Sequence, residues 1–131
     1  MAEIHPPCRI AIADDSPAFV AAAAGYVASM PGFVVAGTAE NAGQALALVR
    51  AATPDVLLLD LGMAPARGLD VVRDVKAAPG APVVVAMTLF HSREAAAAAR
   101  HAGADGLVGK EAFVSGLTQI LAALFPSKVA A

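Results

Sequence analysis

The chain alternates short apolar runs with longer segments of helical character, and this alternation most constrains its fold. The apolar runs are mostly rich in Val, Ile or Leu and are predicted to be strands: residues 8–13, 33–36, 56–59, 83–87 and 106–108. The third and fourth runs are almost continuously apolar, which is typical of strands that are buried on both faces of a sheet.

Helices are predicted in the segments between these runs and after the last one. Apolar residues at helical spacing or helix-favouring alanines fill residues 19–30, 42–49, 69–75, 94–100 and 113–124. Ser16 before Pro17, and Ser92 before Glu94, are signals for the start of a helix. The strict alternation predicts an α/β fold, a (βα)5 doubly wound parallel five-stranded sheet with the flavodoxin-like strand order 2-1-3-4-5.

Length and composition predict a single folded domain. The chain has 131 residues, of which 58% are hydrophobic and 15% charged, so it can bury a sizeable core. No Pro-, Gly- or Ser-rich stretch divides it. We therefore predict one domain over residues 8–125, followed by a short C-terminal tail over residues 126–131.

The charge pattern argues against nucleic acid and membranes as partners. The formal net charge is −2, and the nine Lys and Arg residues are scattered, so we expect no direct binding to nucleic acid. The single cysteine, Cys8, fits a reducing compartment. No signal-peptide pattern is seen, and no apolar run approaches the ~20 residues that span a bilayer, so we expect a cytoplasmic protein without a membrane anchor.

Polar side chains follow four of the five predicted strands. Asp14 and Asp15 come after the first, Asp60 ends the third, Thr88 ends the fourth and Lys110 follows the fifth. Ligands of open parallel sheets bind outside the carboxyl ends of the strands. Because the first and third strands are neighbours in the predicted order, the three acids are expected to share one pocket.

This set of residues suits phosphoryl transfer to an aspartate. Three close carboxylates need a counter-charge. Mg²⁺ fits, because it binds one or two carboxylates and often completes its shell with phosphate oxygens. A lysine ammonium and a threonine hydroxyl suit a phosphoryl group, and a carboxylate can act as the nucleophile that forms an acyl phosphate.

From about Arg9 to Leu124 the chain resembles the bacterial response-regulator receiver domain. The resemblance rests on the acid pair after the first strand, the run Val-Leu-Leu-Leu-Asp that ends at Asp60, Gly68 in the loop beyond it, and the Thr and Lys at the last two strand ends. The segments 33–49 and 103–110 look most like receivers of LuxR-type transcription factors.

The resemblance implies a role for each site residue. Asp60 would accept a phosphoryl group from a histidine kinase, a phosphotransfer protein or a small acyl phosphate. Lys110 would pair with the phosphoryl oxygens, and Thr88 would swing toward the phosphate. Such a domain phosphorylates and dephosphorylates itself and is not a turnover enzyme.

It also implies a Mg²⁺ site and two docking surfaces. Asp15 and Asp60 would bind Mg²⁺ directly, Asp14 through water, and Gly62 through its backbone carbonyl. The phosphodonor would dock on the first helix and the loop after the fifth strand. Output or a homodimer would use the face formed by the fourth helix, the fifth strand and the fifth helix.

Several positions depart from the family pattern. Leu107 stands where most members have the switch aromatic, and Glu111 stands where a proline usually follows the lysine. Proline also comes one residue late in Ala64-Pro65. Leu89 is bulkier than the usual residue after the threonine, so we expect it to cover part of the site.

Two further positions bear on the lifetime of the acyl phosphate. In the family, the positions of Gly62 and Phe90 tune the attack of water. Because neither residue brings a polar side chain, we expect slow intrinsic dephosphorylation.

Three alternatives remain open at this point. The chain could be a pseudo-receiver, which acts as a protein-interaction module without control by phosphorylation. It could be the receiver fragment of a longer DNA-binding response regulator. A flavodoxin-like enzyme or nucleotide binder is disfavoured, because no Gly-rich loop follows the first strand.

Overall fold

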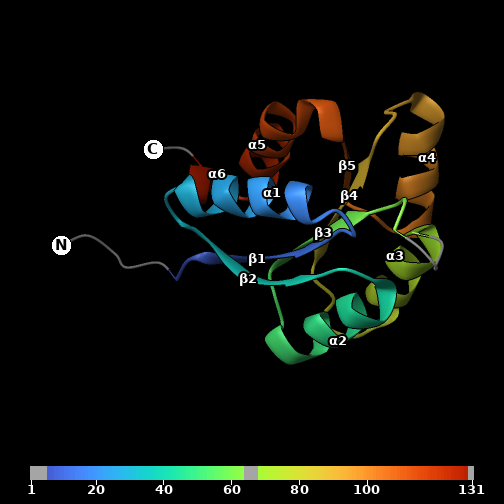
Figure 1. The fold of residues 1–131 in the computed structure, drawn as a ribbon, viewed down its shortest axis with the longest axis horizontal. Coiled ribbons are helices and arrows are strands. Elements are labelled where there is room, and N and C mark those ends of the chain that lie inside the picture. The colour runs from blue at the N-terminus through green and yellow to red at the C-terminus, as the bar shows by residue number, and fades with distance from the viewer. Residues whose placement is uncertain (1–5, 64–67, 130–131) are drawn as a thin grey trace.

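The computed structural model describes residues 6–63 and 68–129. Within these ranges five parallel strands form one sheet in the order β2-β1-β3-β4-β5 (Figure 1). The strands are β1 (Cys8–Ala13), β2 (Phe33–Ala39), β3 (Val56–Asp60), β4 (Val83–Thr88) and β5 (Gly106–Gly109). The predicted doubly wound (βα)5 fold and its strand order are confirmed.

Helices cover both faces of the sheet (Figure 1). One face carries α1 (Pro17–Ser29) and α5 (Phe113–Leu124), and the other carries α2 (Ala42–Ala52), α3 (Gly68–Ala77) and α4 (Arg93–Ala102). A 3-10 turn, η1 (Lys110–Ala112), joins β5 to α5, and a short helix, α6 (Pro126–Val129), follows α5.

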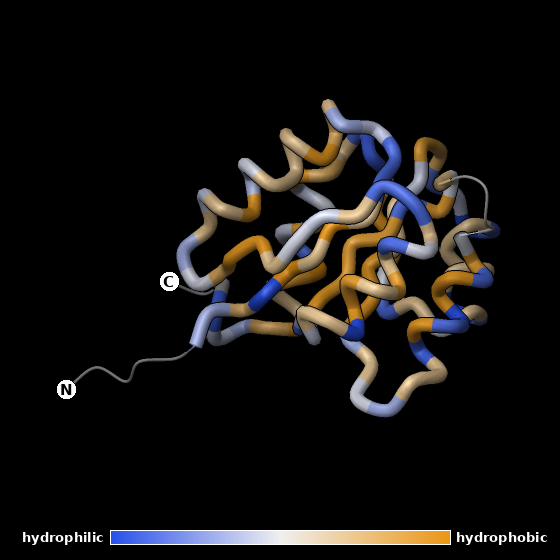
Figure 2. The backbone as a smooth tube through the Cα atoms, turned by 60° about the horizontal axis from the view of Figure 1, so that its bottom comes forward, coloured by the Kyte–Doolittle hydropathy of each residue, from blue (hydrophilic) through white to orange (hydrophobic). Residues whose placement is uncertain are grey.

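The sheet separates two hydrophobic cores. Leu57 and Leu59 of β3 belong to the core under α2, α3 and α4, whereas Val56 and Leu58 belong to the core under α1 and α5. All four side chains are fully buried. The hydrophobic strands run through the middle of the fold in Figure 2. The continuous apolar run of β3 is therefore buried on both faces, as predicted.

Both predicted helix starts are confirmed. The Ser16 hydroxyl accepts a hydrogen bond from the backbone N–H of Phe19 at 3.3 Å, and Pro17 occupies the first turn of α1. Ser92 accepts likewise from Ala95 at 3.0 Å and starts α4. These caps satisfy backbone donors that a helix start leaves free. The cap of α1 also places this helix directly after Asp15.

The second strand is longer than predicted, because β2 continues from residue 36 to Ala39. Its pairing with β1 shifts register between Ile10 and Ala11, opposite Gly37. A Cβ on Gly37 would lie 2.6 Å from Leu48 Cδ1, so this side chain packs directly on the strand backbone. The apolar run stops at the glycine, but parallel pairing needs only backbone groups and extends beyond it.

The two ends of the described chain meet beside the sheet. Residues Pro126–Val129, within the predicted tail, form α6, and the Lys128 ammonium donates a hydrogen bond to the Pro6 carbonyl. The boundary at residue 125 stays a prediction. The Ala64-Pro65 departure lies outside the described residues. None of the described helices is long and apolar enough to cross a membrane.

Cys8 is a buried core residue at the start of β1. Burial, with a smaller contribution from the charge of Asp55, raises the pKa of its thiol to about 11. The thiol is therefore neutral at physiological pH and packs as a small apolar side chain.

Gly68 begins α3 against the chain that leaves β3. A Cβ on Gly68 would overlap the backbone of Leu61, so only glycine allows this close approach. We expect Gly68→Ala to lower the free energy of unfolding by about 1–3 kcal/mol, measured by urea denaturation. Gly25→Ala is the matched control: Gly25 lies inside α1 with nothing within 4 Å of its added Cβ. This control should raise stability by about 0.5–1 kcal/mol. Equal effects of the two substitutions would contradict the packing argument.

Candidate functional site

The predicted site residues meet at the carboxyl edge of the sheet. Asp14 and Asp15 follow β1, while Asp60 ends the neighbouring strand β3. Since Ala13 pairs with Leu59 in parallel register, the acids that come next lie side by side. Each of the three acids has one carboxylate oxygen within 4.8 Å of those of the other two. The structure thus brings together the acids that the sequence predicted to share a pocket.

The pocket above these acids has a volume of about 720 Å³. It also receives side chains from α1, the β4 end and η1. The residues that line it are Asp15, Ser16, Phe19, Asp60, Gly62, Thr88, Leu89, Lys110 and Glu111. All the predicted site residues therefore line this pocket or, in the case of Asp14, lie beneath it among the acids.

Two of the three acids are desolvated. Asp14 is 1% exposed and Asp60 5% exposed, whereas Asp15 is exposed. A buried carboxylate is costly unless charge partners and hydrogen bonds compensate. Ser16 N–H donates to Asp14 Oδ1 at 2.8 Å, and Gly62 N–H donates to Asp60 Oδ1 at 3.0 Å.

Lys110 supplies the positive charge. Its Nζ lies 2.6 Å from Asp14 Oδ2 and 3.3 Å from Asp60 Oδ2, and its side chain is 13% exposed. Burial by itself would lower the pKa of Lys110, but the hydrogen bond to Asp14 and the charge of Asp60 outweigh it, so this pKa is raised. Lys110 is therefore an ammonium at neutral pH.

The donor set fits a divalent metal ion. Three carboxylates within 4.8 Å of one another face one ammonium, so the ionised group carries an excess of two negative charges. Oxygen ligands of this kind are those that Mg²⁺ prefers. Asp15, which is exposed, leaves the metal position open to water and to a substrate.

The residues after β4 form the rim of the pocket. Thr88 accepts a hydrogen bond from the Phe90 N–H at 3.3 Å through its hydroxyl. Leu89 is 66% exposed and Phe90 83% exposed. Leu89 lines the pocket, in agreement with the expectation that it covers part of the site, and most of its side chain lies in solvent.

The other departures from the family pattern lie on two sides of β5. Leu107 is half-buried and packs against the core under α2, α3 and α4. It also lines a cavity of about 290 Å³ between α4, β5 and α5. Glu111 lies at the mouth of the site pocket, and its carboxylate occupies the space that a Cβ on Gly109 would need.

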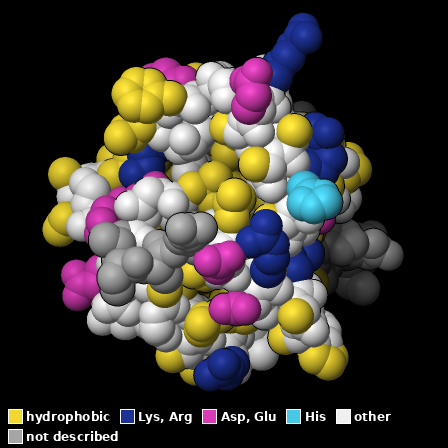
Figure 3. All heavy atoms as spheres, turned by 90° about the vertical axis from the view of Figure 1, so that its right-hand side faces the viewer, with side chains coloured by type: hydrophobic (Ala, Val, Ile, Leu, Met, Phe, Trp, Pro, Cys, Tyr) yellow, Lys and Arg dark blue, Asp and Glu magenta, His cyan; other side chains and the backbone are white. Residues whose placement is uncertain are grey.

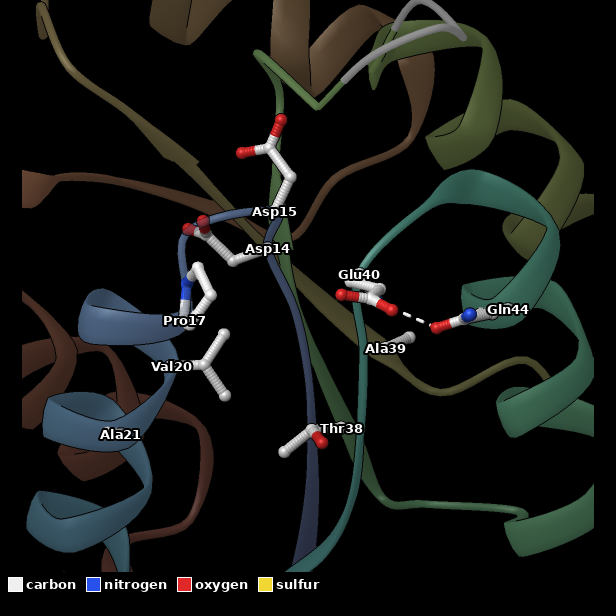
Figure 4. Close-up of a pocket in the computed structure, with 9 residues that line it drawn as sticks. All are labelled: Asp14, Asp15, Pro17, Val20, Ala21, Thr38, Ala39, Glu40 and Gln44. Atoms are coloured by element: carbon white, nitrogen blue, oxygen red, sulfur yellow. Dashed lines mark hydrogen bonds between the residues drawn. The ribbon is translucent and has the colours of Figure 1, made fainter.

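A second pocket, of about 410 Å³, lies on the other side of Asp14 and Asp15, between α1 and the start of α2 (Figure 4). Its polar wall includes Glu40 and Gln44, and the Gln44 side-chain oxygen accepts from the Glu40 N–H at 3.0 Å. In Figure 4 the Asp15 side chain points away from this wall. No sequence pattern predicts this pocket, because it arises from the spacing of two helices.

Sequence reasoning also missed Phe19 as part of the site. Its position on the apolar stripe of α1 predicts a core residue. The structure packs Phe19 against the core under α1 and α5, as this pattern predicts, and also places its ring in the pocket wall, with the Lys110 Nζ 4.6 Å from the ring centroid. The one available signal was its position in the first turn of the helix, four residues after Asp15.

Comparison with known proteins identifies the family. The sequence-family model of the response regulator receiver domain matches residues 10–122, and the chain belongs to this family. Two curated relatives are protein-glutamate methylesterase/protein-glutamine glutaminases. One, from Anaeromyxobacter dehalogenans, is 39% identical to this chain, and the match covers 60% of this chain and 23% of the relative. The other, from Rhizobium etli, is 33% identical, and the match covers 79% of this chain and 30% of the relative. The chain thus spans less than a third of either relative.

Among solved structures, a LuxR-family two-component response regulator from Aurantimonas sp. SI85-9A1 is similar over almost its whole length. Its TM-score is 0.83 at 27% identity, and the match covers 95% of this chain and 96% of that one. This similarity agrees with the LuxR-type pattern seen in the sequence. The chain is a response regulator receiver domain of two-component signalling, a class that binds Mg²⁺ at an acidic pocket and interacts with histidine kinases or phosphotransfer proteins.

The excess negative charge at the site gives a stability prediction. Asp15→Asn should raise the free energy of unfolding, measured without divalent ions, by about 1 kcal/mol. The substitution removes the repulsion between the solvent-exposed Asp15 carboxylate and the carboxylates of Asp14 and Asp60. It should also reduce the extra stability that the protein gains from added Mg²⁺. Thermal unfolding with Mg²⁺ and with EDTA measures both effects.

Asp74→Asn is the matched control, since it removes the same charge from the exposed side of α3. It should leave the Mg²⁺-dependent gain unchanged. If both variants respond alike, the three carboxylates do not form the metal site.

Proposed function

We propose that this receiver domain is a phosphorylation switch whose phosphoacceptor is Asp60. The observation that carries the proposal is the position of Asp60: a buried carboxylate that opens onto a pocket of about 720 Å³, with the Lys110 ammonium 3.3 Å from its Oδ2. A desolvated carboxylate held beside a fixed cation is placed for nucleophilic attack on a dianionic phosphoryl group.

The transfer step is a displacement at phosphorus. A carboxylate oxygen of Asp60 forms the new O–P bond, while the bond from phosphorus to the donor breaks. The electron pair leaves with the donor, which becomes an imidazole or, for acetyl phosphate, acetate. Water attack on the resulting acyl phosphate later returns the carboxylate and inorganic phosphate.

The surrounding residues bind and neutralise the phosphoryl oxygens. Lys110 exchanges its contact with Asp60 for a contact with the phosphoryl group, while its contact with Asp14 keeps it in place. The Thr88 hydroxyl, which also lines the pocket, donates a hydrogen bond to another phosphoryl oxygen. Asp15, Asp60 and the Gly62 carbonyl would hold Mg²⁺ directly and Asp14 would hold it through water, and the ion would neutralise part of the charge on the phosphoryl group.

Two surfaces follow for protein partners. A groove of about 570 Å³ between α1 and the start of α5 opens beside the site and receives the phosphodonor. The α4-β5-α5 face, with the cavity at Leu107, serves output or a homodimer. On the side of the molecule that carries α3 and α4, acidic and basic side chains lie interspersed among the described residues (Figure 3), which favours a protein partner over nucleic acid on this side.

Intact mass spectrometry tests the phosphoacceptor. Incubation with Mg²⁺ and acetyl phosphate should add one phosphoryl group, and EDTA should prevent the addition. Asp60→Asn should abolish it, because the amide is a poor nucleophile, whereas Asp74→Asn should be modified like the unsubstituted protein. A folded protein that takes up no phosphoryl group from acetyl phosphate or from a histidine kinase would be a pseudo-receiver.

The lifetime of the acyl phosphate gives a second prediction. A Cβ on Gly62 would lie 3.5 Å from Asp60 Oδ1, an ordinary contact, so a side chain here would extend over the phosphoryl group. We expect Gly62→Asn to shorten the lifetime several-fold, because its amide can orient the attacking water. The release of inorganic phosphate after removal of the donor measures the rate of dephosphorylation. Gly62→Ala controls for the added bulk, and a similar change in both variants would contradict the role of the amide.

A further inference from the structure

Phe19 lies between the site pocket and the groove between α1 and α5. Its ring lines both hollows together with Lys110 and Glu111. The Lys110 Nζ lies 4.6 Å from the centroid of the Phe19 ring, within the range of a cation–π interaction. The ammonium is thus in contact with two carboxylates and with the face of an aromatic ring.

The ring itself is held in place by a second aromatic residue. Phe113, the first residue of α5, meets the Phe19 ring edge-on, with centroids 5.2 Å apart and planes at 78°. Phe113 is 8% exposed and makes a similar contact with Tyr26, at 6.1 Å and 76°. The Tyr26 hydroxyl hydrogen-bonds Thr118 across α1 and α5. The face of Phe19 therefore has a fixed orientation.

A lysine ammonium needs an additional contact to stay in one position, because the lysine side chain is flexible. Its four-carbon stem is flexible, and its ammonium is a point charge without directional preference. The carboxylates of Asp14 and Asp60 attract the ammonium toward the sheet. The π-face of Phe19 adds attraction from α1, and it does so in a site where Lys110 is only 13% exposed, so solvent screens the contact little.

We propose that Phe19 is a positioning residue for phosphoryl transfer: its ring holds the Lys110 ammonium at the place where the phosphoryl oxygens arrive. The proposal rests on the proposed phosphorylation of Asp60. Phe19 touches no reacting atom and acts through Lys110. Its effect is on the rate of transfer, because a cation already in place needs no reorganisation as charge develops.

Graded fluorination of the ring tests the electrostatic part of the proposal. Phe19 is replaced site-specifically by mono-, di- and trifluorophenylalanine, which keep the shape of the ring but progressively remove the negative charge of its face. The rate constant of phosphorylation by acetyl phosphate, at saturating Mg²⁺, should fall stepwise, to about three- to tenfold below the unsubstituted protein for the trifluoro ring. The same series at Phe33, a core residue of β2, should leave the rate unchanged.

Conventional variants separate positioning from packing. Phe19→Tyr retains an aromatic face and should retain the rate, whereas Phe19→Leu retains an apolar side chain and should be as slow as the trifluoro protein or slower. Urea denaturation establishes that each variant is folded. A rate that follows stability instead of the aromatic face would overturn the proposal.

Nuclear magnetic resonance of the lysines gives a readout that is independent of activity. The chain has only three lysines, at positions 76, 110 and 128, so their labelled side-chain signals are readily assigned. The ring current of Phe19 should shift the ε-methylene protons of Lys110 upfield, and Phe19→Leu should remove this shift. Absence of the shift in the unsubstituted protein would overturn the proposed contact.

The combined results distinguish the two hypotheses. If the protein is phosphorylated on Asp60 and the rate is flat across the fluorinated series, the role of Phe19 is wrong and the proposed function stands. If the ring-current shift is present but no phosphoryl group is taken up, the contact exists, while the proposed function fails and the role in transfer fails with it.

Discussion

The site depends on one ammonium group placed between two buried carboxylates. Parallel pairing of β1 with β3 places Asp14 and Asp60 side by side at the edge of the sheet. Both carboxylates are buried there, and an unpaired buried charge would cost several kcal/mol. Lys110 compensates both, and it can do so because η1 turns the chain back over the sheet directly after β5. The compensation is incomplete, because a single ammonium faces two buried carboxylates and Asp15 adds a third negative charge from the exposed side. This residual charge is what makes the same cluster a place for a divalent ion and, after it, a phosphoryl group.

The order of the elements could be predicted from the sequence because burial on two faces leaves a strong signature. β3 and β4 are continuous apolar runs, and Ser16 and Ser92 are polar residues directly before helices. The end of β2 could not be predicted in this way. Past Gly37 the strand is held by backbone pairing with β1, and its side chains at the sheet edge carry no hydrophobic pattern. Hydropathy thus finds strands that lie inside a sheet more reliably than the ends of those at its edge.

The polar part of the site could also be predicted, since strand order alone brings the strand-end residues together. The apolar part could not. Phe19 obeys the same periodicity as the core residues of α1, and only the rotation of that helix decides that its ring faces Lys110. Leu89 lines the pocket, in agreement with the expectation that it covers part of the site, but how far it extends into solvent depends on the loop after β4, which leaves it 66% exposed. Residue type and spacing identify which groups meet, whereas side-chain direction comes from packing angles that no local pattern encodes.

Phe19, Lys110 and Glu111 line both the site pocket and the groove between α1 and α5. Partner choice and reaction rate therefore share residues. A substitution that adapts this groove to a different protein also alters the surroundings of the ammonium, so specificity and speed evolve as coupled traits at this wall. Ala22 and Ser115 line the groove but not the site pocket, so variation at these exposed positions carries no such penalty, and adaptation to new partners is freer there.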